Sequence, residues 1–126
     1  MQIKRFEVNS VASTLSYSPD GKILVVGLWD NSIRFWNIEI ESVIGEIEGH
    51  SNLIYSICYH KDGKSLASGS RDKTIRIWDT EAFSEKGQLI GHELEVFCVR
   101  YSPDGLKLAS CSGDNTVRIW DIELMK

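Results

Sequence analysis

The sequence twice carries the residue types of a nucleophilic hydrolase at identical spacings. In such a site the serine attacks the substrate, the histidine removes its proton and the aspartate orients the histidine. Here the set occurs in two copies, whereas an enzyme needs one, and neither serine stands in a Gly-x-Ser-x-Gly turn. A tryptophan follows each aspartate by six residues, which catalysis does not require. We therefore interpret both sets as structural and expect no enzymatic activity. The sets are His50, Ser68 and Asp72, then His92, Ser110 and Asp114.

The spacing between the two sets is a period of the whole chain. Tryptophan recurs as Trp36, Trp78 and Trp120, each 42 residues after the one before. Asp-Gly pairs at 20–21, 62–63 and 104–105 keep the same step. The chain has 126 residues, so three repeats fill it. We expect one continuous region, 1–126, with repeat 1 at about 1–48, repeat 2 at about 49–90 and repeat 3 at about 91–126.

The sequence predicts four short strands in each repeat. Leu53–Tyr59 is rich in β-branched and aromatic residues, and Thr74–Trp78 alternates with a period of two. Ser65–Ser70 lies between them as a strand of small residues, and Glu85–Ile90 follows as a weaker fourth strand. Turn residues separate the strands: Ser18–Gly21 has Pro second and Gly last, which suits a type I turn. The sequence predicts an all-β protein.

These residues carry a resemblance to a known family. Gly49-His50, Leu66–Ser70 and Thr74–Asp79 together resemble one WD repeat, and the segment from Gly91-His92 to Trp120-Asp121 resembles another. The first repeat departs from the pattern, with Glu7-Val8 in place of Gly-His and Asn37 in place of the last Asp. The resemblance implies a partial β-propeller of three four-stranded antiparallel blades.

The resemblance also implies a hydrogen-bond network within each blade that links Trp, Ser, His and Asp. A buried indole N–H and a buried imidazole each need a partner, so such a network would stabilise the blade. The first repeat has only two of the four residues, with Val8 and Val26 at the other two places. The network residues are His50, Ser68, Asp72 and Trp78, then His92, Ser110, Asp114 and Trp120, and in the first repeat Asp30 and Trp36.

Three blades cannot close a ring, because propellers have typically 4–8. We expect completion by oligomerisation or by further blades: a homodimer with six, a homotrimer with nine, or the remaining blades of a longer protein or hetero-complex. We expect Gln2–Val8 to form an outer strand that could complete the last blade of this chain or of a neighbour. Lys126 falls before a fourth strand of the third repeat.

The family resemblance implies a non-catalytic scaffold that binds a protein or peptide on the narrower face of the propeller. Trp29, Tyr55, Phe97 and Arg71 are residue types that dominate binding hot spots. Packing between blades is the alternative role for Tyr55 and Phe97. Two further functions stay open: a purely structural module that assembles only with other blades, and part of an enzyme complex. The expected contact residues are Val11, Ser13, Trp29, Leu53, Tyr55, Arg71, Glu95, Phe97 and Gly113.

Composition excludes several classes of partner. Lys and Arg number 14 against 18 Asp and Glu, and no basic run exceeds Lys4-Arg5, so we expect no nucleic-acid partner. The three cysteines form no Cys-x-x-Cys pair, and we expect free thiols, no metal and no cofactor.

No apolar stretch could span a membrane, and no signal peptide begins the sequence, so we expect a cytoplasmic or nuclear protein. His60 is expected to be solvated beside its turn.

Overall fold

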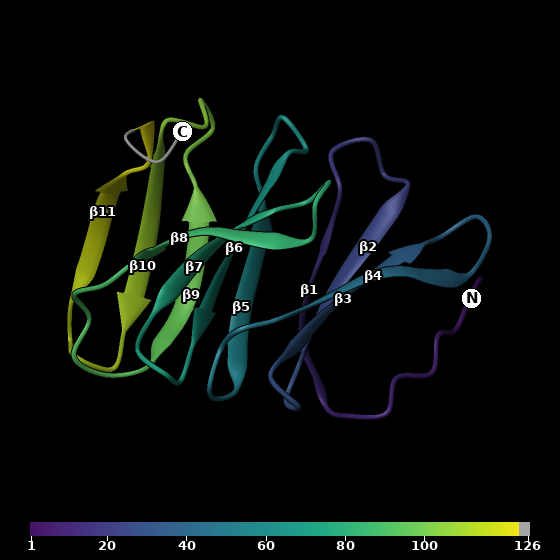
Figure 1. The fold of residues 1–126 in the computed structure, drawn as a ribbon, viewed down its shortest axis with the longest axis horizontal. Helices are drawn as coiled ribbons and strands as arrows, with labels where there is room; N and C mark the ends of the chain where they lie inside the picture. Colours follow the sequence, from purple (N-terminus) through teal and green to yellow (C-terminus); the bar gives the residue numbers. More distant parts are fainter. Residues whose placement is uncertain (124–126) are drawn as a thin grey trace.

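The computed structural model describes residues 1–123, which form three twisted antiparallel sheets stacked side by side (Figure 1). The first sheet comprises β1 (Ala12–Tyr17), β2 (Ile23–Leu28), β3 (Ser32–Asn37) and β4 (Ser42–Glu48). The second comprises β5 (Ile54–Tyr59), β6 (Ser65–Ser70), β7 (Ile75–Asp79) and β8 (Ser84–Leu89). The third comprises β9 (Val96–Tyr101), β10 (Lys107–Ser112) and β11 (Val117–Asp121).

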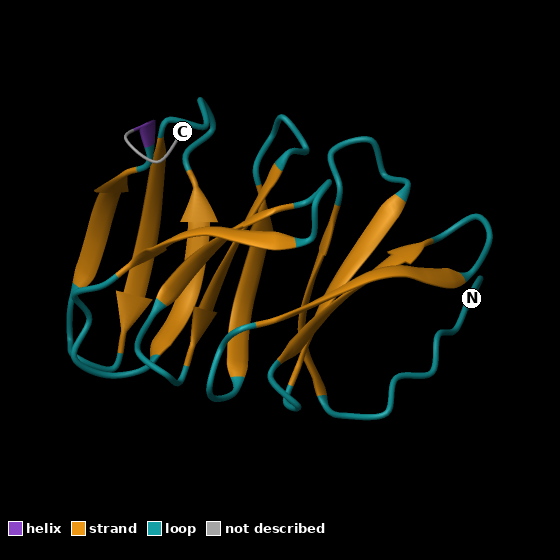
Figure 2. Ribbon diagram, in the orientation of Figure 1, coloured by secondary structure: helices purple, strands orange, loops and turns teal. Residues whose placement is uncertain are grey.

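The predicted all-β blades are confirmed, and short loops connect their strands (Figure 2). The four strands predicted for the second repeat agree with β5–β8 to within a residue at each end. The third sheet has three strands within residues 1–123, because the positions one period after β8 begin at residue 126. The predicted turn also forms: the amide of Gly21 donates to the carbonyl of Ser18 at 2.9 Å, and Gly21 takes the positive φ of 75° that glycine tolerates.

The sheets stack through apolar faces, with β1 beside β5 and β5 beside β9. Phe35 from the first sheet and Ile57 and Trp78 from the second belong to one fully buried cluster. A second cluster joins Ile77 of the second sheet to Val99 of the third. Burial of these side chains holds the stack together, at about 25 cal/mol for each Å² of apolar surface removed from water.

Hydroxyl groups add hydrogen bonds between neighbouring sheets. The Thr14 hydroxyl on β1 accepts a hydrogen bond from the amide of Ile57 on β5 at 3.2 Å. One period later, the Ser56 hydroxyl on β5 accepts from the amide of Val99 on β9 at 3.1 Å. The same hydrogen bond therefore recurs at both contacts between sheets.

The N-terminal segment corrects one expectation. Residues 1–11 form no strand, although Gln2–Val8 was predicted to be one. Instead, Phe6 packs against Trp36 with ring centroids 5.1 Å apart, and the Lys4 ammonium donates to the carbonyl of Ile38 at 2.7 Å. The segment follows the outer face of the first sheet, away from β11, whose free edge lies at the other end of the stack (Figure 1). Burial of Phe6 on Trp36 is available there, whereas the edge of β11 is out of reach.

His60 corrects another expectation, because its ring is not solvated. The ring nitrogen Nε2 lies 2.8 Å from the carbonyl oxygen of Gly105 in the next sheet, and the imidazole packs edge-on against Tyr101. The side chain is 15% exposed. His60 therefore joins the turns of the second and third repeats.

Candidate functional site

The second repeat contains a continuous chain of hydrogen bonds from a buried indole to a carboxylate. The indole N–H of Trp78 lies 2.8 Å from the Ser68 hydroxyl oxygen, and an indole nitrogen can only donate. Ser68 therefore accepts from Trp78 and donates its own hydrogen to Nε2 of His50, 2.5 Å away. Nδ1 of His50 then donates to the carboxylate of Asp72 at 2.7 Å. Every polar atom along this path has a partner.

The third repeat reproduces the same chain of hydrogen bonds. Trp120 donates to Ser110 at 2.8 Å, and His92 lies 2.7 Å from Ser110 and 2.8 Å from Asp114. A serine nucleophile must be reached by its substrate, yet Ser68 is 0% and Ser110 is 3% exposed. In this conformation neither hydroxyl can attack a molecule in solution, so the arrangement supports a structural role.

The two aspartates of the network are held in the ionised form. Burial raises the pKa of Asp72, but hydrogen bonds from His50 and Thr74 outweigh it and hold the pKa well below its usual value. For Asp114, burial again raises the pKa, and hydrogen bonds from Thr116 and His92 lower it further than burial raises it. The folded chain therefore binds protons at these carboxylates less readily than the unfolded chain does.

Two threonines complete the network and were missed in the sequence. The hydroxyls of Thr74 and Thr116 each donate to their aspartate at 2.6 Å. They stand 42 residues apart, and Ser32 occupies the same place in the first repeat. The period could therefore have identified them.

The first repeat lacks the chain of hydrogen bonds. Nε1 of Trp36 is buried without a hydrogen-bond partner, since Val26 replaces the serine. Asp30 bonds instead to the neighbouring Ser32 hydroxyl and to the Arg34 guanidinium, at 2.5 and 3.3 Å. The indole is covered by apolar contact with Phe6, not by a polar partner.

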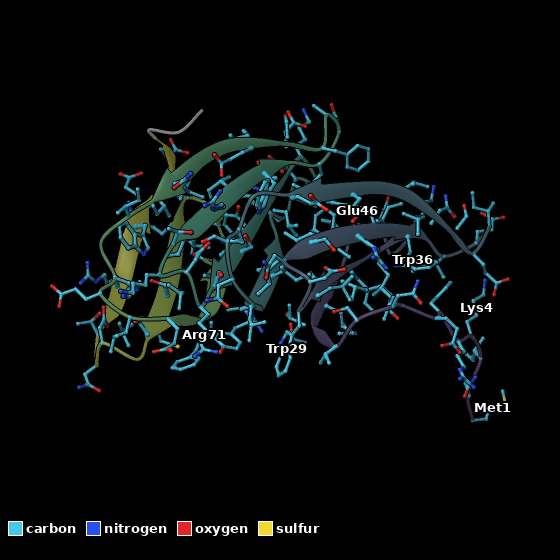
Figure 3. All side chains as sticks on the ribbon, turned by 60° about the horizontal axis from the view of Figure 1, so that its bottom comes forward. Met1, Lys4, Trp29, Trp36, Glu46 and Arg71 are labelled. Carbon is cyan, nitrogen blue, oxygen red and sulfur yellow. The ribbon has the colours of Figure 1, made fainter. Side chains whose placement is uncertain are left out.

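The expected contact residues lie together at one edge of the sheets. The same main-chain hydrogen bond recurs in each repeat: Trp29 to Val11 at 2.9 Å, Arg71 to Leu53 at 2.8 Å, and Gly113 to Glu95 at 3.0 Å. Each bond joins a turn between the second and third strands to the start of the first strand. We call the nine predicted contact residues of the three repeats the rim, and Figure 3 shows Trp29 and Arg71 on this edge.

Apolar side chains of the rim face solvent. Trp29 is 43%, Phe97 48% and Val11 53% exposed. The rings of Tyr55 and Phe97 contact each other across two sheets, with centroids 5.4 Å apart. The rings therefore pack between blades, and Phe97 still exposes about half of its surface to solvent.

The remaining rim residues differ in their exposure to solvent. The Arg71 side chain is exposed, whereas Leu53, Glu95 and Gly113 are half-buried. Ser13 is exposed, and its hydroxyl also donates to the carbonyl of Ile54 in the next sheet. Leu94, 45% exposed beside Glu95, belongs to the same surface and was missed. An apolar residue directly after His92-Glu93 in a turn was the available signal.

Comparison with known proteins agrees with this geometry. The family model described as WD40, "WD domain, G-beta repeat", matches residues 2–37, 41–79 and 83–121, which is most of the chain. The chain belongs to the WD40 repeat family. The predicted boundaries near 48 and 90 remain a prediction, although β4 and β8 end at Glu48 and Leu89.

Individual relatives support the same assignment. A 44-residue stretch is 41% identical to the general transcriptional corepressor TUP1 of Saccharomyces cerevisiae and covers 35% of this chain and 6% of that protein. Two solved structures, described as U3-55K and as the WD40 repeats of RRP9, each superpose with a TM-score of 0.90 at 26% identity over 95% of this chain. The chain spans 38% of each of those structures. WD40 repeat proteins are protein-interaction scaffolds and are typically non-catalytic.

Two other features are absent from the described residues, a metal-binding cluster and a membrane-spanning helix. Residues 1–123 contain no group of three or more His, Cys, Asp or Glu side chains placed to hold a metal ion. The same part of the chain contains no helix with the length and hydropathy needed to cross a membrane.

Proposed function

We propose that this WD40 chain is a non-catalytic scaffold that binds a protein or peptide on the rim, the narrower face in the family. The observation that carries the proposal is the solvent exposure of Trp29 and Phe97 on a rigid edge. Large aromatic side chains and arginine contribute most of the binding energy at many interfaces. Main-chain hydrogen bonds fix the rim in each repeat, so a partner would meet a preorganised surface.

The test is binding of peptides selected from a display library against the immobilised chain. We expect Trp29→Ala and Arg71→Ala each to weaken the selected peptides by about 1–2 kcal/mol, roughly 5- to 30-fold, while the melting temperature stays unchanged. Ile40→Ala and Lys61→Ala are matched controls, since both residues are exposed in turns at the opposite edge of the sheets. If all four variants bind as wild type does, the rim is not the binding surface.

A second candidate function, assembly with further blades, rests on the outer face of the third sheet. Val117 is 75% and Ile119 is 67% exposed. One period earlier, Ile75 and Ile77 occupy the same positions and are 0% and 5% exposed, because the third sheet covers them. A further blade would cover Val117 and Ile119 in the same way. Homodimer, homotrimer and a longer propeller remain the alternatives.

Light scattering on a size-exclusion column distinguishes these alternatives. The chain has a mass of 14.3 kDa, so twice or three times that mass indicates closure by its own copies. Polydisperse association indicates that other blades are needed. A monodisperse species of 14.3 kDa would contradict this second proposal, because the apolar faces would then be stable in water.

The remaining expectations about partners and location are part of the proposal. Net charge of −4 without a basic cluster supports a protein partner over nucleic acid. The three cysteines are free thiols, which supports the reducing cytoplasm or nucleus. The resemblance of one segment to a transcriptional corepressor favours the nucleus. Fractionation of cells that express the tagged chain tests this location.

A further inference from the structure

The three repeats place different charges at the rim. Each repeat contributes the entry to its first strand and the turn between its second and third strands, which one main-chain hydrogen bond joins. Apart from the aspartate of each turn, these segments are uncharged in the first repeat, basic in the second and acidic in the third. The entry segments are 9–11, 51–53 and 93–95, and the turn segments are 29–31, 71–73 and 113–115. The charged residues are Arg71 and Lys73, then Glu93 and Glu95.

These four charges have no partner among the described residues 1–123. None of the four side chains forms an ion pair or a hydrogen bond in that part of the chain. By contrast, Arg34 and Arg76 on the third strands of the first two repeats each contact two carboxylates. The aspartates of the turns are occupied within their own repeats, as Asp72 is by His50. The four charges are therefore available to another molecule.

Further blades would leave this surface open. Arg71 and Lys73 belong to the second repeat, which has a sheet stacked on each of its faces, and both residues are nevertheless exposed. Blades meet through the faces of their sheets, whereas the rim is an edge formed by turns. The rim of a longer propeller would therefore keep these charges in contact with solvent.

The third repeat makes room for one of its acidic side chains. A Cβ on Gly113 would lie 2.7 Å from Oε1 of Glu95, so the carboxylate lies directly over this glycine. At the same turn position the second repeat has Arg71 and the first has Trp29. A larger residue at 113 would push the carboxylate away. The glycine therefore keeps the acidic group at the rim of the third repeat.

The distance between stacked sheets sets the spacing of a partner's side chains. Sheets pack about 10 Å apart face to face, and an extended chain advances about 3.3 Å per residue. An extended peptide that crosses the rim along the stack would therefore meet a new repeat about every three residues. The groups complementary to the three repeats are an apolar side chain, a carboxylate and a basic side chain, in that order.

We propose that the partner of the rim is an extended peptide whose middle anchor is a carboxylate. An apolar side chain lies about three residues to one side of it, and a basic side chain about three residues to the other. The carboxylate binds Arg71 and Lys73, because a guanidinium donates parallel hydrogen bonds to a carboxylate. The apolar side chain covers Trp29, and the basic side chain binds Glu93 and Glu95. This preference rests on the function proposed above, because it exists only if the rim binds peptides.

The test selects peptides from a random display library on the wild-type chain and on Arg71→Glu, and measures their affinities by fluorescence polarisation. We expect an acidic residue in the middle of the peptides selected on wild type, in either chain direction, and none there on Arg71→Glu. Arg71→Glu should weaken the wild-type peptides roughly tenfold or more, and lysine at their middle position should restore binding to this variant. Lys61→Glu is the matched control, since it makes the same change in net charge at the opposite edge of the sheets and should leave the affinities unchanged.

A second exchange extends the test to the third repeat. On the double variant Arg71→Glu with Glu95→Lys, a peptide with its acidic and basic positions exchanged should bind more tightly than the original peptide. Melting curves verify that the variants fold.

The outcomes separate the charge preference from the proposed function. Peptides that lose affinity on Trp29→Ala but bind Arg71→Glu as tightly as wild type would overturn the preference and leave the proposed function intact. The preference is also overturned if lysine in the peptide does not restore binding to Arg71→Glu, or if phosphoserine binds at the middle position and glutamate does not. Both are overturned if the selection enriches no peptide, or if the enriched peptides ignore Trp29→Ala and Arg71→Glu alike.

Discussion

The first and second repeats bury equivalent tryptophans, but only the second repeat provides a hydrogen-bond partner for the indole N–H. In the second repeat Trp78 donates to Ser68, and the bond continues to His50 and Asp72. In the first repeat the indole N–H of Trp36 has no partner, and a phenylalanine from the N-terminal segment lies against the ring. Both repeats nevertheless form complete four-stranded sheets.

The comparison separates what builds a blade from what reinforces it. Alternating apolar strands and their turns are sufficient to form the sheet, since the first repeat has them without the network. An unpaired buried N–H costs about 1–3 kcal/mol, whereas replacing several members of a network by apolar residues is close to neutral. Val8 and Val26 replace the histidine and the serine, so only the indole N–H is left without a partner.

The largest difference is expected on removal of the tryptophans. Trp78 is 1% exposed and both packs in the core between sheets and holds the network, so Trp78→Ala should lower the free energy of unfolding by about 3–5 kcal/mol. Trp36→Ala should cost less, because its indole N–H has no bond to lose and its face lies at the open end of the stack. Urea denaturation measures both variants. Equal losses would show that the network adds nothing beyond burial.

The next largest difference in stability loss is expected between Asp72→Ala and Asp30→Ala. Asp72 has a side chain that is 4% exposed and accepts hydrogen bonds from His50 and Thr74, so Asp72→Ala should cost about 2–3 kcal/mol. The Asp30 side chain is 39% exposed and bonds only within its own turn and strand, so Asp30→Ala should cost about 1 kcal/mol or less. Thermal melting of the two variants at pH 7 provides the comparison. A larger loss from Asp30→Ala would contradict it.

Acid should remove the contribution that the hydrogen-bond network makes to the free energy of unfolding. The pKa of Asp72 in the folded chain lies below its unfolded value of about 3.9, so the folded chain binds fewer protons at low pH. The stability that Asp72 contributes is fully present above its pKa in the unfolded chain. It is lost as the pH falls through its pKa in the folded chain. Unfolding free energies measured by urea from pH 6 down should therefore decline below about pH 4. The Asp72→Asn variant should show a shallower decline, and a parallel decline would assign the acid sensitivity to other carboxylates.

The smallest effect is expected on rebuilding the network in the first repeat. Val26→Ser gives Trp36 an acceptor but loses apolar burial, so alone it should change stability by about 1 kcal/mol or less. Val8→His supplies the next partner, and Asp30 is already present. The double variant should therefore be more stable than the sum of the single changes by about 1 kcal/mol. A double-mutant cycle measures this coupling, and additive changes would mean that the N-terminal segment holds residue 8 out of reach.

The internal period explains why much of the fold and the network could be predicted. The set of His50, Ser68 and Asp72 recurs at the same spacing in the third repeat, so this spacing was meaningful without any structure. Turns are local as well, which is why Ser18–Gly21 folds as its Pro and Gly predict. Gln2–Val8 was mistaken for a strand because strand propensity says nothing about whether an edge is within reach.

The sequence by itself determined the repeat, the four strands of the second repeat, the turn at Ser18–Gly21 and the Trp, Ser, His and Asp positions of the network, because all of these depend on contacts within one 42-residue unit. Only the tertiary structure decided that Ser68 is inaccessible, that His60 bonds to Gly105, and that Val117 faces solvent. These properties depend on how one sheet stacks on the next. Ile77 is buried because another sheet follows it, whereas Ile119, one period later, is exposed because no sheet follows it within residues 1–123.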